Sequence, residues 1–161
     1  MMGKTVILGG LVILTLGGTA GVWAIATGQT LTSTPGQPFD LAEGDRLYQD
    51  YCAACHGANL EGQPDWRSAG PEGIFPAPPH NETGHTWHHS NSVLFDYTKL
   101  GGKAALARQG VDFTSGMPGF GDQLTNPQIR NILAFIKSTW PDRQLEVQAA
   151  RSDAERQQQG N

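Results

Sequence analysis

The stretch YCAACHGANLEG, residues 51–62, contains the two cysteines of the chain, Cys52 and Cys55, with His56 directly after them. Two cysteines separated by two residues occur in three kinds of site: a disulfide redox pair, half of a zinc site, and the anchor of a covalently attached haem. Each kind needs something different from the rest of the chain. The remaining sequence therefore decides which kind of site is present, and the kind of site in turn indicates the fold.

The zinc and disulfide alternatives find little support elsewhere in the sequence. A structural zinc site needs four ligands, commonly as two cysteine pairs, and the chain has no second pair, so such a site would have to recruit histidines. A thioredoxin-type redox pair belongs to a βαβ pattern, and no alternating apolar strand pattern is present. A structural disulfide between residues so close in sequence would close a very short loop and stabilise little.

The run Cys52-Ala53-Ala54-Cys55-His56 instead matches the pattern of c-type haem attachment. Two residues between the thiols set the sulfurs at the separation of the two vinyl groups on one porphyrin edge. The next residue, His56, then directs its imidazole at the iron. The sequence therefore predicts one covalently bound haem c, with its iron, as the cofactor.

Length and composition indicate one loop-rich domain. The chain has 161 residues, no internal repeat, and as many as 21 glycines and 10 prolines, which limit long regular elements. A small domain with so many loops has difficulty burying enough apolar surface alone, so a cofactor that helps to form the core is expected. The formal charge of −4 argues against a nucleic-acid binder, which needs a basic face.

The N-terminus is a separate apolar segment. No charged residue occurs between Thr5 and Gln29, and the run from Val6 to Ala26 is long enough for a membrane-spanning helix. A secretory signal cleaved after Ala26 is the alternative, and in both cases the rest of the chain is exported. Lys4, which precedes the run, weakly places that end in the cytoplasm.

The segment boundaries follow from these changes in composition. We predict a signal-anchor helix or signal peptide, a polar linker, a folded domain and a polar tail that begins as a helix and loses order toward its end. Their limits are residues 1–26, 27–39, 40–141 and 142–161.

Two helices are expected in the first two thirds of the domain. The first covers about residues 41–53, with Asp40 as its cap and Glu43 at the capping-box position. The second covers about residues 91–100, with Ser90 as its cap. The pair Gly101-Gly102 follows, and glycine commonly ends a helix.

The third helix, near residues 126–140, has the clearest pattern. Thr125 is its cap, Pro127 lies in the first turn and Gln128 stands at the reciprocal capping position. An amphipathic apolar stripe follows at helical spacing: Ile129, Ile132, Leu133, Ile136 and Trp140. The long connections before it, residues 54–90 and 101–124, are unusual in a compact domain unless they wrap around something.

Met117 is the candidate for a second iron ligand. It lies in the glycine-rich loop TSGMPGFGDQLT, residues 114–125, where a methionine is unexpected because this residue normally fills cores. A thioether bond to haem iron would explain it, and packing beneath the loop is the alternative. The 61 positions between His56 and Met117 are enough for the chain to reach the far face of the ring.

Together these features resemble a class I cytochrome c over residues 40–141. The resemblance is greatest to bacterial monohaem members that are periplasmic or anchored in the membrane. It implies an all-α fold of three main helices and long loops around one haem. It further implies Cys52 and Cys55 as thioether anchors, His56 as the proximal iron ligand and Met117 as the distal one.

The resemblance also implies two internal contacts. Gly44 and Tyr48 resemble the glycine and aromatic pair at which the first helix of the family crosses the last. Their partners would come from three residues of the last helix: Leu133, Phe135 or Ile136. The proximal histidine of the family usually donates its other N–H to a loop carbonyl beside a proline, and three prolines are candidates: Pro76, Pro78 and Pro79.

The loop PAPPHNETGHTWHHSNS, residues 76–92, departs from the shorter members because it holds four of the five histidines: His80, His85, His88 and His89. One hypothesis is a second metal site, such as copper. The other is a loop packed beside the haem, with its histidines bonded to propionates or to the backbone. A further alternative is that one of these histidines replaces Met117 as the iron ligand. Such a replacement would lower the reduction potential.

The expected function is one-electron transfer by a protein that is not an enzyme. A peroxidase-like haem enzyme and a haem sensor with a displaceable Met117 are the alternatives. We expect weak, transient encounters with redox partners and membrane attachment through the N-terminal segment. The domain is expected on the periplasmic side of a bacterial inner membrane, or soluble in the periplasm if the chain is cleaved after Ala26.

Overall fold

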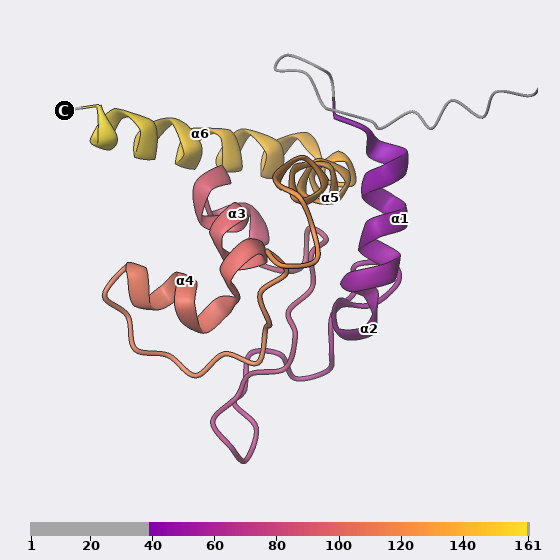
Figure 1. Ribbon diagram of the computed structural model, residues 1–161, viewed down its shortest axis with the longest axis vertical. Helices are drawn as coiled ribbons and strands as arrows, with labels where there is room; N and C mark the ends of the chain where they lie inside the picture. Colours follow the sequence, from indigo (N-terminus) through magenta and orange to yellow (C-terminus); the bar gives the residue numbers. More distant parts are fainter. Residues whose placement is uncertain (1–38, 161) are drawn as a thin grey trace, which may run out of the picture. The chain divides into compact units, whose positions relative to one another are not determined.

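The structure, a computed structural model, describes residues 39–160 and contains helices and no strands over that range. The helices are α1 (Leu41–Tyr51), α2 (Ala53–His56), the short 3-10 helix η1 (Thr86–His88), α3 (Asn91–Leu100), α4 (Gly102–Arg108), α5 (Asn126–Ser138) and α6 (Asp142–Gln159). The predicted all-α fold is therefore confirmed. Figure 1 shows the helices joined by long loops that descend between them.

The predicted N-terminal segment 1–26 lies outside the described residues, as does the linker except for Phe39. Among the residues that are described, no helix combines the length and the apolar composition needed to cross a membrane. Membrane attachment stays a prediction.

The helix starts follow the capping residues. The Asp40 side chain accepts a hydrogen bond from the Glu43 N–H, 2.9 Å away, at the start of α1. The Ser90 side chain caps α3, and Thr125 with Gln128 forms a complete capping box at the start of α5. Each cap satisfies an N–H group that has no partner within its helix. All three predicted helices are present with these caps.

The crossing of α1 with α5 forms the centre of the core. In Figure 1, α5 is seen end-on beside α1. Tyr48 is fully buried there and its ring lies 5.6 Å from that of Phe135, which confirms one of the three predicted partners. Gly44 faces the backbone of Asn131, which the sequence analysis did not single out.

The apolar stripe of α5 closes this core. Ile129, Ile132, Ile136 and Trp140 are at most 5% exposed, whereas Leu133 is half-buried. The stripe packs with residues of α1, of α3 and of the loops that precede α3 and α5: Leu47, Tyr48, Cys52, Leu60, Leu94 and Leu124. Apolar burial of this kind is the main favourable term in folding. The core therefore links the segment that carries the cysteines to the last helix of the predicted domain.

The expectation of an unstructured loop over residues 101–124 was wrong at its start. Gly101, with φ of +84°, ends α3, but Gly102 already belongs to α4. The sequence GKAALAR of α4 contains three alanines and a leucine, which are good helix formers. Only the first of the two glycines acts as a helix end, and the second begins a new helix.

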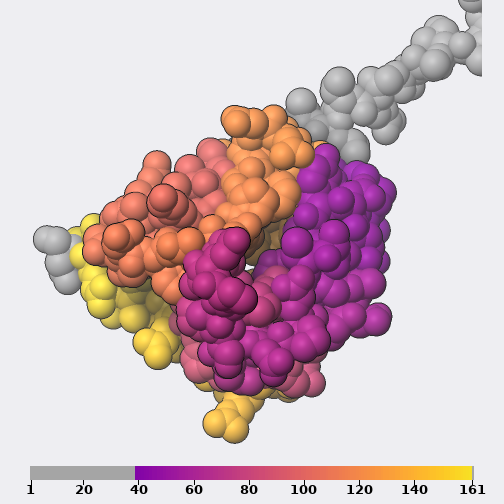
Figure 2. Space-filling model, turned by 90° about the horizontal axis from the view of Figure 1, so that it is seen from below, coloured from indigo at the N-terminus to yellow at the C-terminus, as the bar shows by residue number. Residues whose placement is uncertain are grey.

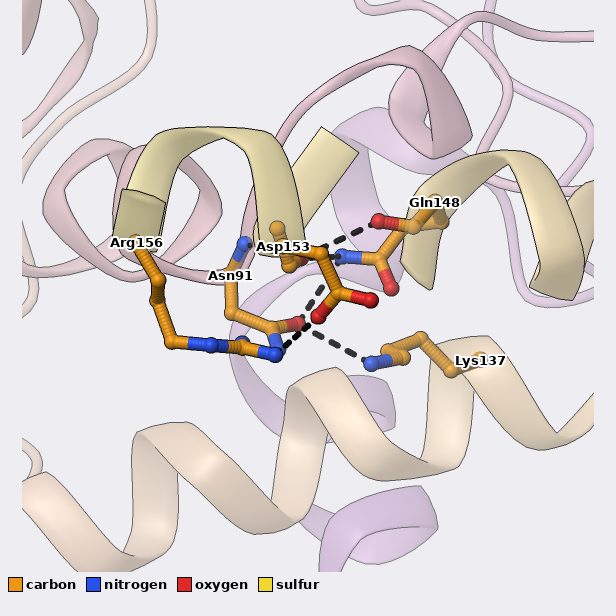
Figure 3. A network of polar contacts seen from close by, with 6 residues as sticks. Asn91, Lys137, Gln148, Asp153 and Arg156 are labelled. Carbon is orange, nitrogen blue, oxygen red and sulfur yellow. Dashed lines mark hydrogen bonds and ion pairs between the residues drawn. The ribbon is translucent and has the colours of Figure 1, made fainter. Parts of the chain in front are cut away.

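The C-terminal tail begins as a helix, as predicted, but the expected loss of order was wrong as far as Gln159, because α6 is helical to that residue and is packed against the domain. Its interface is polar: Gln148 is 1% exposed and Ser152 is 3% exposed. Figure 3 shows Gln148 directed at Asn91, the first residue of α3, to which Lys137 of α5 also donates. Apart from Leu145, which packs against the core, hydrogen bonds rather than an apolar stripe hold this helix in place.

Candidate functional site

The two cysteines and His56 lie on one helical turn at the end of α1. Cys52 ends α1, and its carbonyl accepts a hydrogen bond from the His56 N–H at 2.9 Å, so α2 continues the turn as far as His56. Gly57, with φ of +81°, then redirects the chain. The Cys52 side chain is buried, the Cys55 side chain is exposed, and the two thiols are not joined by a disulfide.

The environment of Cys52 differs from that of a redox-active cysteine. Burial, reinforced by the charge of the neighbouring Cys55, raises the pKa of the Cys52 thiol to about 12. Such a thiol stays protonated at neutral pH, whereas a catalytic redox pair uses a thiolate of low pKa. The βαβ unit to which a thioredoxin-type pair belongs is also absent from residues 39–160, which contain helices and no strands, so the structure gives no support to the disulfide-exchange alternative.

His56 is buried, and its ring is oriented by the loop that follows it. Its Nδ1 atom lies 2.8 Å from the Pro78 carbonyl oxygen, which selects one of the three candidate prolines. Because a carbonyl only accepts, Nδ1 carries the proton and Nε2 keeps its lone pair. Burial lowers the pKa of His56, and the bond to Pro78 partly opposes that effect. The result is a neutral imidazole with Nε2 available as a metal ligand.

The loop after His56 is fastened to this turn at several points. The Gly62 N–H donates to the His56 carbonyl at 2.7 Å, and the Tyr48 hydroxyl donates to the Gly57 carbonyl at 2.8 Å. Figure 2 shows an opening bordered by the α1–α2 segment, by the magenta loop that follows it, and by an orange segment of the later chain. Hydrogen bonds thus join the turn that contains His56 both to α1 and to the loop that follows it.

Met117 lies in the loop between α4 and α5 and is half-buried. Its carbonyl accepts from the Gly102 N–H at 3.1 Å, and its own N–H donates to Ser115 Oγ at 3.2 Å. The first bond attaches the loop to the start of α4, and the second lies within the loop. Met117 also borders an open hollow of about 460 Å³ that it shares with Leu100 and Pro118. These contacts fix the backbone of the loop, and ligation of iron by the Met117 sulfur stays a prediction.

Two of the four loop histidines are neighbours, with the ring centroids of His85 and His89 5.3 Å apart, but the four do not gather at one point. His85 stacks on Trp66 with ring centroids 5.4 Å apart, His88 stacks on Trp87 at 3.7 Å, and His89 lies 6.2 Å from Tyr97. Nowhere in the stretch 39–160 do three or more metal-ligating side chains gather. The structure therefore supports neither the second metal site nor a zinc site completed by histidines.

The fourth of these histidines, His80, differs from the others because its ring contacts that of His56. Its ring stacks on that of His56, with centroids 4.0 Å apart and an interplanar angle of 22°. Burial lowers the pKa of His80 well below its usual value, and the nearby His56 and His85 act in the same direction. No spacing in the sequence distinguishes His80 from its neighbours, so this contact could not be foreseen.

The arrangement fits a c-type haem. Two unpaired thiols stand with two residues between them on a helical turn, and a neutral imidazole with an available Nε2 follows them. A family model for cytochrome c matches residues 41–140. The chain belongs to the cytochrome c family. Members of this family bind haem c covalently, so the cofactor of this cytochrome is haem c with its iron.

Comparison of this cytochrome with curated proteins and with solved structures gave no match. The family match ends at Trp140, one residue before Pro141 caps α6. Helix α6 is thus an addition to the part of the chain that the family model describes. Cytochromes of this family are in general electron carriers rather than enzymes.

Proposed function

We propose that the protein is a one-electron carrier whose haem is attached through Cys52 and Cys55 and ligated by His56 and Met117. The position of His56 carries this proposal. It follows the two thiols on a single turn, and the Pro78 carbonyl holds its Nδ1 at 2.8 Å. A metal-ligating histidine commonly has its second nitrogen bonded in this way, which fixes the tautomer and makes the ligand more basic. Bound haem supplies a ferric–ferrous couple that accepts and releases one electron.

The protein residues set the properties of that couple. A methionine ligand raises the reduction potential, so Met117 would favour the reduced state. Ligation by both His56 and Met117 would leave no coordination position for a substrate. This is the condition for a carrier, because a peroxidase-like enzyme needs an open distal side with an acid–base group.

The charge of the chain supports a basic redox partner. Residues 40–82 carry eight acidic and two basic side chains, whereas residues 83–140 carry three acidic and five basic ones. The half of the domain that contains the haem motif is therefore strongly acidic, and a positively charged partner would be attracted to it. Encounters of this kind are weak, short-lived and slowed by salt. Rates of electron transfer to a cationic cobalt complex should fall as ionic strength rises, and those to an anionic iron complex should increase.

We place the domain outside the cytoplasm, on the periplasmic side of a bacterial inner membrane. The apolar run in residues 1–26 supports this location, either as an anchor or as a signal cleaved after Ala26. Mass determination of the mature protein from membrane and soluble fractions decides between them. A mature chain that begins after Ala26 and is found only in the soluble fraction would contradict the anchor.

The experiment that tests the carrier function is optical spectroscopy of the haem-loaded protein beside its Met117→Ala variant. We expect a c-type spectrum and a far-red band of the ferric form, from sulfur ligation, that disappears in the variant. Ser115→Ala is the matched control, because it removes the bond to the Met117 N–H but leaves the sulfur. That control should retain the band.

Other outcomes would contradict parts of the proposal. Haem without the far-red band in the wild type would mean that a loop histidine replaces Met117 or that the distal side is open. Binding of carbon monoxide by the ferrous protein, or rapid turnover of peroxide, would then favour the sensor or the enzyme. Absence of covalent haem would remove the basis of the assignment of Cys52, Cys55 and His56.

A further inference from the structure

The His80 ring lies face to face with the His56 ring. A hydrogen bond at Nδ1 and a metal bond at Nε2 would hold the His56 ring at two points. Rotation of the ring about the line between those points would then be limited only by the Cγ–Cβ bond and by packing. A flat group against one face removes that freedom, and the His80 ring is such a group at a centroid distance of 4.0 Å.

His80 is held by partners from three distant parts of the chain. Its N–H donates to the Leu60 carbonyl at 2.8 Å, and its carbonyl accepts from Trp140 Nε1 at 2.7 Å. Its ring Nδ1 lies 2.8 Å from Thr86 Oγ1. The edge of the His80 ring also faces Tyr48, with centroids 6.2 Å apart. Because these contacts fix the His80 ring, that ring determines the orientation of the His56 ring beside it.

The contact with Thr86 indicates which ring nitrogen of His80 carries the proton. The Thr86 hydroxyl lies 3.4 Å from the Pro79 carbonyl, to which it can only donate. Its oxygen is then the acceptor for an N–H at His80 Nδ1. Thr86 is itself 6% exposed, so a polar pair is buried here that an apolar side chain would have avoided. Filling space is therefore not a sufficient reason for a histidine at this position.

We propose that His80 is a positioning residue for the iron ligand: its ring fixes the rotation of the His56 imidazole plane, and its π face favours the ferric state. The electronic part follows from the negative face of an aromatic ring. A ligand imidazole carries more positive charge when the iron is ferric, and that charge is attracted to the facing ring. This proposal rests on the proposed function, because it needs His56 as the ligand.

The test compares His80→Phe, which keeps a flat ring, with His80→Leu, which keeps apolar bulk alone. Proton NMR of the ferric protein gives the order of the haem methyl shifts, which depends on the orientation of the axial imidazole plane. We expect the wild-type order in His80→Phe and a changed or averaged order in His80→Leu. The reduction potential should be higher in His80→Leu than in His80→Phe. A wild-type methyl order and potential in His80→Leu would overturn the proposal.

A second pair of variants keeps the proposal testable if His80→Leu fails to assemble. Thr86→Val removes the partner of the His80 ring, and Thr86→Ser keeps the hydroxyl. We expect changed methyl shifts in Thr86→Val, because the His80 ring would turn to find another partner for its unpaired Nδ1–H, whereas the phenyl ring of the His80→Phe variant has no such group. We expect wild-type shifts in Thr86→Ser. Wild-type shifts in both would overturn the role of His80 while leaving the carrier function intact. Loss of histidine ligation in the wild type itself would overturn both proposals, so the two failures are distinguishable.

Discussion

At the scale of single residues, Gly44 shows how little space the core leaves. A Cβ atom at this position would lie 2.2 Å from the Asn131 carbonyl oxygen and 2.9 Å from Phe135 Cβ. The first of these is backbone, which cannot rotate away as a flexible side chain would. The absence of a side chain at Gly44 is therefore what allows α1 and α5 to approach.

Gly44→Ala should lower the free energy of unfolding by about 3 kcal/mol or more, although alanine favours a helix over glycine by about 1 kcal/mol. The steric conflict with Asn131 is the reason. Denaturant unfolding followed by circular dichroism measures the change. Ala42→Gly, at an exposed position of the same helix, is the control and should cost only about 1 kcal/mol. A Gly44→Ala variant as stable as the wild type would show that the helices can separate without loss.

At the scale of secondary structure, α6 differs from α1 and α5 because polar groups attach it. Ser152 Oγ accepts from the Asn91 N–H and from Gln148 Nε2, each at 3.1 Å, and donates to the Gln148 carbonyl at 3.0 Å. Gln148 also reaches the His89 carbonyl at 3.3 Å. Figure 3 shows this arrangement between α6 and the start of α3. One hydroxyl therefore connects the added helix to the start of α3, and Gln148 connects it to His89.

Ser152→Ala should accelerate amide hydrogen exchange in α6 and lower the free energy of unfolding by about 1–2 kcal/mol, because buried partners lose their bonds. Exchange in α1 and α5 should be unchanged. Asp153→Ala is the matched control, since its ion pair with Arg156 is exposed on the surface and contributes little. Equal exchange rates in α6 of the two variants would mean that the helix is held by something other than this hydroxyl.

At the scale of the whole molecule, the histidines make stability depend on pH. Burial lowers the pKa of His89, and the charges of His85, His88 and Arg151 add to the effect. Burial likewise lowers the pKa of His85, with His88 and Arg67 contributing. The unfolded chain, with histidine pKa values near about 6.5, therefore binds protons more readily than the folded protein. The stabilisation that comes from keeping these histidines neutral is complete above the pKa of the unfolded chain. It is lost as the pH falls toward the lower pKa values of the folded state.

The free energy of unfolding should therefore decrease when the pH is lowered from about 7.5 to about 5.5, by up to about 1.4 kcal/mol per pH unit for each proton taken up. His89→Gln should show a smaller decrease, because one titrating group is gone while the backbone carbonyl that binds Gln148 remains. Urea unfolding at a series of pH values measures both slopes. Identical slopes would exclude His89 as a source of the pH dependence.

How far the sequence predicts this molecule depends on the range of the interaction. The caps Asp40, Ser90 and Thr125 act within one helical turn, so their helices could be located from sequence. The haem motif is equally local. Helix α4 was missed because two consecutive glycines were both interpreted as a stop, although its alanines favoured a helix.

The contacts that escaped prediction join distant residues through polar groups. The docking of α6 depends on Gln148 and Ser152, and hydropathy patterns do not detect an interface made of hydrogen bonds. The stacking of His80 on His56 depends on how a long loop folds back, which no periodicity determines. Within the predicted site, the structure identifies the Pro78 carbonyl as the hydrogen-bond partner of His56. The role of Met117 as an iron ligand still rests on the resemblance to the cytochrome c family.

The crossing of α1 with α5 also has a consequence for the order of maturation. Asp40 and Asn131, which are bonded across it, are 91 positions apart, so the crossing cannot form until nearly the whole domain has been synthesised. A chain made from its N-terminus presents Cys52, Cys55 and His56 long before α5 exists. We therefore expect the enzymes that attach haem to act on the motif while the chain around it is still unfolded. Packing of α1 against α5 would then follow covalent attachment of the haem.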